Sequence, residues 1–196
     1  MNDADGAPRR WLTPLALCIA GPIAGVLLGA ATNAINDSVC SDYFAIVMSW
    51  DGTHPILQAV VQGMLEGFAL GLFFAFFFTI ASAASTRLRC PLSLAMRTLA
   101  MAVAIVLVCW IVGGVAGVIL SLIRPQLWGF FFVGVPSRVS LPRFAWVGGS
   151  IWGAYGGTIL ALIVCGIHVH LRWRRISGPT RAFAVLMTDA SVQSPS

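Results

Sequence analysis

The sequence predicts an all-α integral membrane protein with four transmembrane helices, and three observations carry this prediction. Apolar residues make up 58% of the 196 residues and charged residues only 10%, against about 45–50% and 25% in soluble domains. The mean hydropathy is +0.88. Four apolar runs each exceed the ~20 residues that a helix needs to cross a bilayer. So short a chain cannot bury that much apolar surface, which excludes a soluble enzyme.

Each apolar run is expected to be a helix, because the hydrocarbon core offers no water to unpaired backbone groups. The expected spans are residues 11–31, 56–84, 98–123 and 144–168. The segments between them carry the charges, prolines and turn residues. We therefore divide the chain into three parts. They are a cytoplasmic segment at 1–10, a transmembrane domain at 11–171, and a basic and then disordered cytoplasmic tail at 172–196.

The arginines set the expected orientation. All twelve basic residues are arginines, and nine of them lie on one side of the four spans. Those nine are Arg9, Arg10, Arg87, Arg89, Arg97, Arg172, Arg174, Arg175 and Arg181. By the positive-inside rule both termini are cytoplasmic, and we expect a bacterial inner membrane. The first span is expected to be retained rather than cleaved, because residues 31–34 form a poor cleavage site and three more spans follow.

Small residues recur four apart in every expected span, so that they lie on one helix face. The glycines of these stripes are Gly21, Gly25, Gly29, Gly63, Gly67, Gly71, Gly113, Gly117, Gly149, Gly153 and Gly157. Lipid gives helices no hydrophobic drive to associate, and such stripes allow close backbone approach. We expect a glycine zipper that serves helix packing.

The two halves of the chain resemble each other. Residues 19–29 match residues 111–121, and residues 62–67 match residues 148–153, at equivalent points of the spans. The sequence therefore predicts two related helical hairpins, an internal repeat of the kind found in some transporters. The alternative is chance, because apolar sequence of low complexity matches itself easily.

Glu66 is the only acidic residue inside an expected span. It lies about ten residues into the second span, or ~15 Å at 1.5 Å per residue. An ionisable side chain at that depth is costly and is a candidate for function. Gln62, four residues earlier, is placed to form a hydrogen bond with it. Two interpretations stay open: a site for an ion, proton or solute, or polar glue between helices.

The two loops expected on the outer face carry opposite charges. The first holds the candidates Asp37, Asp42, Tyr43, Asp51 and His54, and the second holds Arg124, Arg138 and Arg143. Such loops should attract each other and could dock over a ligand. The alternative is ordinary turn and helix-capping chemistry.

Catalytic motifs are missing from the sequence: there is no nucleophile elbow, no HExxH and no P-loop. We expect no enzyme, no cofactor, no metal and no nucleic-acid partner. The partners are the lipid bilayer and, as candidates, other membrane subunits or a second copy. The first functional hypothesis is a structural or accessory membrane subunit. The alternative is a transporter or channel component for a small solute, ion or proton that uses Glu66 and Gln62.

Overall fold

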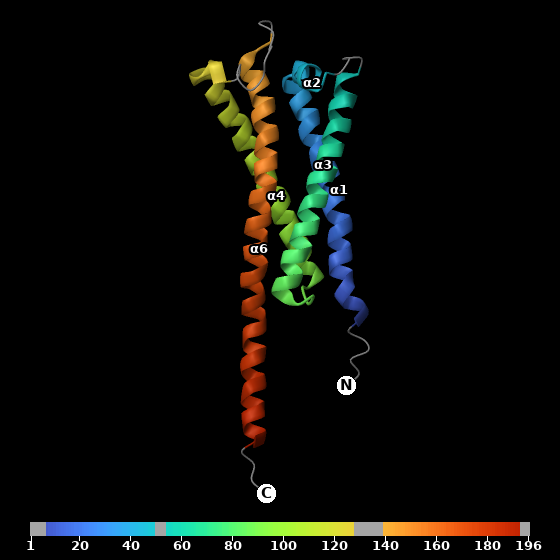
Figure 1. Ribbon diagram of the computed structural model, residues 1–196, viewed down its shortest axis with the longest axis vertical. Coiled ribbons are helices and arrows are strands. Elements are labelled where there is room, and N and C mark those ends of the chain that lie inside the picture. Colours follow the sequence, from blue (N-terminus) through green and yellow to red (C-terminus); the bar gives the residue numbers. More distant parts are fainter. Residues whose placement is uncertain (1–6, 50–53, 128–138, 193–196) are drawn as a thin grey trace.

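The computed structural model describes residues 7–49, 54–127 and 139–192, with side chains for 11–49, 54–127 and 139–176. Figure 1 shows its helices, which are α1 (Ala7–Val39), α2 (Ser41–Met48), α3 (Pro55–Thr86), α4 (Leu92–Ile123) and α6 (Leu141–Val192). Four of them contain stretches long and apolar enough to cross a membrane: Trp11–Val39, Pro55–Thr86, Leu92–Ile123 and Leu141–Ile176. The prediction of an all-α protein with four candidate spans is confirmed.

Three helices run well beyond the expected boundaries. α4 begins at Leu92, although the expected span begins at residue 98. The segment from Asn33 to Val39 was expected to be a loop, but it continues α1. The tail was expected to be disordered, but α6 continues to Val192. Extending an existing helix adds one hydrogen bond per residue without a new nucleation step. Ala, Leu, Arg and Met in the tail also favour helix.

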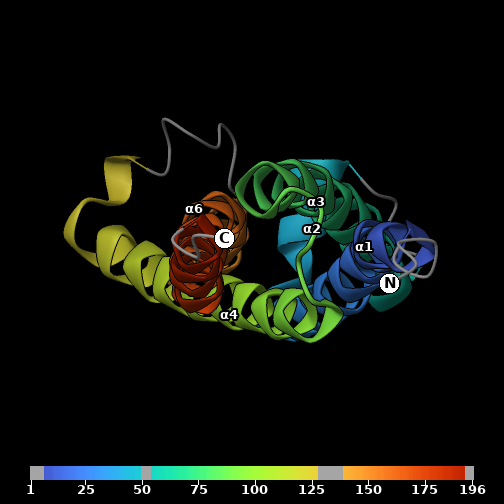
Figure 2. The same ribbon diagram turned by 90° about the horizontal axis from the view of Figure 1, so that it is seen from below.

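The helices form two pairs. α1 packs mainly against α3, and α4 packs mainly against α6, whereas contacts between the pairs are fewer and join mostly α3 to α6 and α1 to α4. Figures 1 and 2 show the helices of each pair crossing. Both termini lie at one end of the bundle, here named the terminal end, and α2 lies at the other, named the α2 end. The short helix α2 thus covers one end of the space between the pairs.

Backbone meets backbone where the helices of a pair cross. A Cβ atom at Gly25 would strike the carbonyl oxygen of Gly67, and one at Gly67 would strike that of Gly25. Gly113 and Gly149 obstruct each other in the same way in the second pair. The other expected stripe glycines with a similarly close neighbour on the paired helix are Gly21, Gly29, Gly63, Gly71, Gly117, Gly153 and Gly157.

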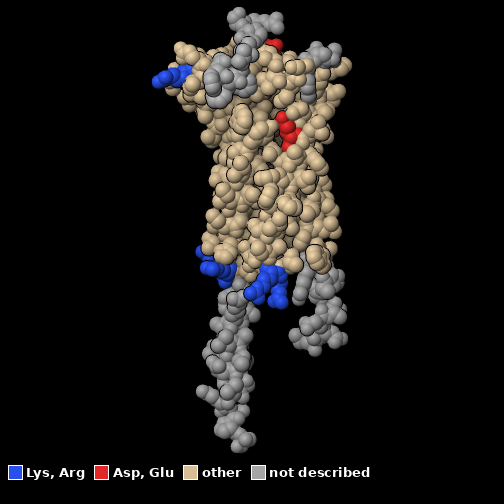
Figure 3. All heavy atoms as spheres, in the orientation of Figure 1, with Lys and Arg blue, Asp and Glu red and all other residues tan. Residues whose placement is uncertain are grey.

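Two apolar clusters fill the ends of the bundle. The terminal-end cluster consists of Leu17, Phe74, Phe78, Cys90, Ala95, Leu99, Ala102, Ala161, Cys165 and Val169. The α2-end cluster consists of Cys40, Tyr43, Phe44, Ala59, Val139, Phe144, Val147 and Ile151. On the face in Figure 3, basic side chains lie towards the ends, and an uncharged belt between them is interrupted by one acidic patch. This belt is the surface that lipid would cover.

Candidate functional site

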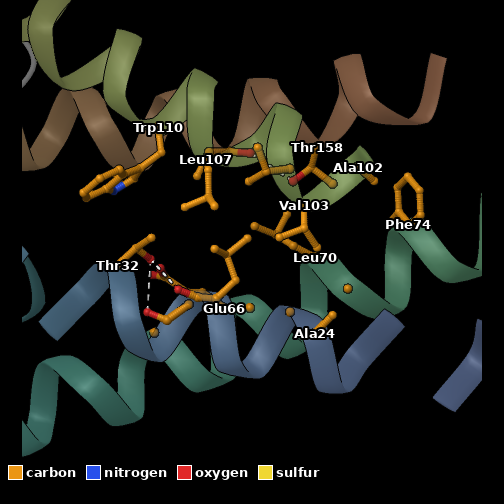
Figure 4. Close-up of a pocket in the computed structure, with 18 of the residues that line it drawn as sticks. Ala24, Thr32, Glu66, Leu70, Phe74, Ala102, Val103, Leu107, Trp110 and Thr158 are labelled. Atoms are coloured by element: carbon orange, nitrogen blue, oxygen red, sulfur yellow. Dashed lines mark hydrogen bonds between the residues drawn. The ribbon is translucent and has the colours of Figure 1, made fainter. Parts of the chain in front are cut away.

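A pocket of about 80 Å³ lies between the two helix pairs, and α1, α3, α4 and α6 all line it. Most of its lining is apolar. Figure 4 shows Val103, Leu107 and Trp110 of α4 across the pocket from Thr32 of α1 and Glu66 of α3. A largely apolar pocket with a few convergent polar groups is the usual form of a small-molecule site.

Glu66 connects the two pairs at this pocket. The Gln62 Nε2 atom donates a hydrogen bond to Glu66 Oε1 over 2.7 Å, so the hydrogen bond expected from the four-residue spacing is present. The hydroxyl of Tyr155, on α6, lies close enough to the Glu66 side chain to interact with it electrostatically. Groups from both pairs therefore lie near one carboxyl group. Sequence reasoning missed Tyr155, because nothing in the chain signals that α6 faces α3 at this level.

Tyr43 brings α2 to the same place. Its side chain is buried, and its ring centroid lies 4.8 Å from that of Phe144 in α6. Burial raises the pKa of Tyr43, and the nearby Glu66 and Tyr155 raise it further. The Tyr43 hydroxyl therefore stays neutral across the physiological pH range. Among the candidates expected in the outer loops, Tyr43 is the one brought near Glu66.

Two buried N–H donors of the pocket lining have no hydrogen-bond partner within the described part of the chain. They are Asn33 Nδ2, on a side chain 3% exposed, and Trp110 Nε1, on a side chain 7% exposed. Thr32 and Thr158 also line the pocket, but their hydroxyls donate to carbonyl groups of their own helices. A buried donor without an acceptor costs about 1–3 kcal/mol. Both donors would therefore be stabilised by an acceptor placed in the pocket.

Polar groups continue from the pocket towards the α2 end. Asn36 is fully buried, and the Ser150 hydroxyl of α6 lies 3.1 Å from its Oδ1 atom as a donor. The atoms Asn36 Nδ2, Asp37 Oδ1 and Trp146 Nε1 have no partner among the described residues. The rings of Trp110 and Trp146 stack edge to face, with centroids 5.9 Å apart. Buried polar groups thus continue towards the α2 end, beside the apolar residues of the α2-end cluster.

The expected outer-loop candidates are spread over several elements. Asp37 lies in the last turn of α1 and not in a loop, because α1 extends past Asn33. Asp42 lies in the first turn of α2, His54 directly precedes α3, Arg124 follows α4, and Arg143 lies in the first turn of α6. Asp51 and Arg138 fall outside the described residues.

Comparisons of the chain with protein-family models, curated proteins and solved structures found no match. Function must therefore be inferred from the chemistry of the pocket. A carboxyl group that accepts a hydrogen bond from Gln62, in a pocket with two unpaired N–H groups, can bind a small hydrogen-bonding solute or exchange a proton.

Proposed function

We propose that this chain is a small transporter or channel component that binds a small solute, ion or proton in the pocket at Glu66. The observation that carries the proposal is the position of Glu66. An ionisable residue within a candidate span lines a pocket, accepts a hydrogen bond from Gln62 and lies near Tyr155 of the other helix pair. Intramembrane carboxyl groups of this kind mark ion and proton pathways.

Polar glue is the simplest competing explanation, and it accounts for only part of the site. A bond between Glu66 and Tyr155 fits glue between helices, since such bonds stabilise membrane helix contacts. A purely structural role for Glu66 does not explain why the buried donors Asn33 Nδ2 and Trp110 Nε1 have no acceptor among the described residues. A pocket that receives an acceptor explains these donors as well.

We further propose that the pairs are related repeats, each packed through its glycine stripe. The matching sequence segments support this, as does the reciprocal close approach of Gly25 with Gly67 and of Gly113 with Gly149. Two rigid units with few contacts between them suit a protein that opens a central site by moving one repeat against the other.

The second candidate function is a structural or accessory membrane subunit without enzymatic activity, bound to other membrane proteins or to a second copy. The same glycine contacts favour it, because they optimise helix packing and need no ligand.

We propose that both termini lie on the cytoplasmic side of a bacterial inner membrane, which the nine arginines support. The sequence points to Cys40 as an outside reporter and Cys90 as an inside reporter. Both thiols are buried, and burial raises the pKa of each. Both should therefore react slowly at neutral pH and faster as the pH rises, because the thiolate is the reactive form.

Exposed positions make better reporters of orientation. Ser140→Cys lies at the α2 end and Arg89→Cys lies at the terminal end. In intact cells an impermeant maleimide should label Ser140→Cys at once and Arg89→Cys only after permeabilisation. The reverse pattern would invert the orientation.

The functional test is Glu66→Gln in reconstituted vesicles. The amide keeps the shape of the side chain and can still form hydrogen bonds, but it cannot exchange a proton. We expect the variant to melt like the parent and to lose pH-dependent flux of protons or small cations. A Glu66→Gln protein that matches the parent in every pH-dependent assay would contradict transport through Glu66.

A further inference from the structure

We propose that water reaches Glu66 from the α2 end only, along a polar seam of α1, so that Glu66 exchanges protons with the solution on that side. The seam consists of Thr32, Asn33, Asn36 and Asp37. This inference rests on the proposed function and specifies the route by which the proton reaches its site.

The seam leads from the pocket to the α2 end of the bundle. Thr32 and Asn33 line the pocket, and Asp37 lies in the last turn of α1. These residues cover about 7.5 Å along the helix at 1.5 Å per residue. Asn33 packs beside Gly63 of α3. In the sequence, Gly63 follows Gln62 and precedes Glu66 by three residues. The polar side chains of α1 therefore run next to the turn of α3 that carries the carboxyl group.

The unpaired atoms along this route suit water better than an ion. Four are donors, on Asn33, Asn36, Trp110 and Trp146, and one is an acceptor, on Asp37. The donors would repel a cation, and the acidic side chains at both ends disfavour an anion. Water donates and accepts, and a buried water needs two to four polar partners in a space of at least ~10–15 Å³. The pocket volume of about 80 Å³ exceeds this requirement.

The route is closed on the other side of Glu66. There the one polar lining residue in the described part of the chain is Thr158, whose hydroxyl donates to a carbonyl group of its own helix (Figure 4). The apolar lining residues on this side include Leu70, Phe74 and Leu99, and the terminal-end cluster follows. Phe78, Ala161 and Cys165 of that cluster are fully buried. The two thiols of that cluster, Cys90 and Cys165, donate to the carbonyl oxygens of Pro91 and Thr98. On this side of Glu66, Thr79 Oγ1 is the buried side-chain atom without a partner among the described residues. Water molecules would therefore find few partners here.

The groups around Glu66 leave it as the proton-exchanging residue of the pocket. Tyr43 of α2 and Tyr155 of α6 lie near it, and the Tyr43 hydroxyl stays neutral across the physiological pH range. From α1, the charged residue on the route is Asp37, which lies at the α2 end. The lining residues of α4 include no ionisable side chain.

The experiment compares two matched threonine positions in vesicles. Thr32 lies on the route and Thr98 lies beside the terminal-end cluster, and each hydroxyl donates to the carbonyl group four residues earlier in its helix. Methyl methanethiosulfonate is small and reacts with thiolates, which form only in contact with water. Mass spectrometry of the modified peptides gives the rates. Thr32→Cys should react at least ~10-fold faster than Thr98→Cys, because only the former would ionise. The native Cys165 is the unreactive reference in both proteins.

Equal rates at the two positions would overturn the inference. A second measurement does not depend on substitutions in the seam and is made at a pH low enough to protonate Glu66. The carboxyl C=O band of Glu66, assigned by its loss in Glu66→Gln, should then shift in infrared spectra soon after transfer of the parent to D2O. A band that fails to shift would also overturn it. If Glu66→Gln abolishes flux but Thr32→Cys stays unreactive, the proposed function stands and the route is wrong. If Thr32→Cys reacts but Glu66→Gln leaves flux unchanged, the route stands and the function is wrong.

Discussion

The interface inside each helix pair and the interface between the pairs are built on opposite principles. Inside a pair, backbones meet at glycines such as Gly25 and Gly67, and no space is left for even a Cβ atom. Between the pairs, side chains meet, a pocket stays open, and buried donors such as Asn33 Nδ2 lack partners. Lipid supplies no hydrophobic drive, so close packing must hold each pair together. The closely packed pairs therefore form a scaffold, and the pocket with its buried polar groups lies between them.

The largest effect is expected inside a pair. In Gly67→Ala the new Cβ atom would strike the carbonyl oxygen of Gly25, and in Gly153→Ala it would strike that of Cys109. Backbone atoms cannot move aside, so the helices must separate. We expect each variant to lose on the order of 1–3 kcal/mol of stability, the usual range for overpacking. Melting in detergent measures the loss.

Gly156→Ala is the matched control for this prediction. A Cβ atom at Gly156 meets nothing within 4 Å. Replacing glycine by alanine inside a helix stabilises the helix by up to about 1 kcal/mol. Gly156→Ala should therefore melt at or above the temperature of the parent. If Gly67→Ala melted like Gly156→Ala, the interiors of the pairs would not be as tight as described.

An intermediate effect is expected between the pairs, at Glu66. Glu66→Leu removes the acceptor of the Gln62 hydrogen bond and the carboxyl group near Tyr155, and Tyr155→Phe removes only the Tyr155 hydroxyl. Hydrogen bonds between membrane helices average ~0.6 kcal/mol and reach ~1.7 kcal/mol. We expect Glu66→Leu to fall near the upper value and Tyr155→Phe near the average. Adding Tyr155→Phe to Glu66→Leu should then cost almost nothing. Additive losses in this double-mutant cycle would show that the two residues do not interact.

The two interfaces also differ in how far the sequence predicts them. Apolar runs predict the four spans, because membrane thickness fixes helix length. The i, i+4 spacing predicts that Gln62 can bond to Glu66, because both lie on one helix. Such features depend on local geometry alone.

Features of the interface between the pairs depend on partners far away in the chain. Asn33 and Asn36 follow the first expected span, and asparagine favours turns, so the sequence predicts a loop there. They lie inside α1, where Asn36 meets Ser150, 114 residues later. Tyr155 carries no signal in an apolar helix until α3 is known to face it. The site is therefore harder to predict than the scaffold.

The smallest effect is expected at the second hydrogen bond between the pairs. The Ser150 hydroxyl has a choice of acceptors: Asn36 Oδ1 at 3.1 Å and, within α6, the carbonyl oxygen of Val147 at 2.9 Å. Ser150→Ala should cost no more than the average ~0.6 kcal/mol, because water arriving along α1 can replace the hydroxyl.

Ser82→Ala is the control, since the hydrogen bond of this buried serine stays within its own helix, and it should cost less. A loss of stability above ~2 kcal/mol for Ser150→Ala would indicate that no water replaces the hydroxyl and that Asn36 Oδ1 stays without a hydrogen bond. This result would contradict a polar interface that is open to water. Equal losses for the two variants would show that the bond to Asn36 adds nothing to the contact between the pairs.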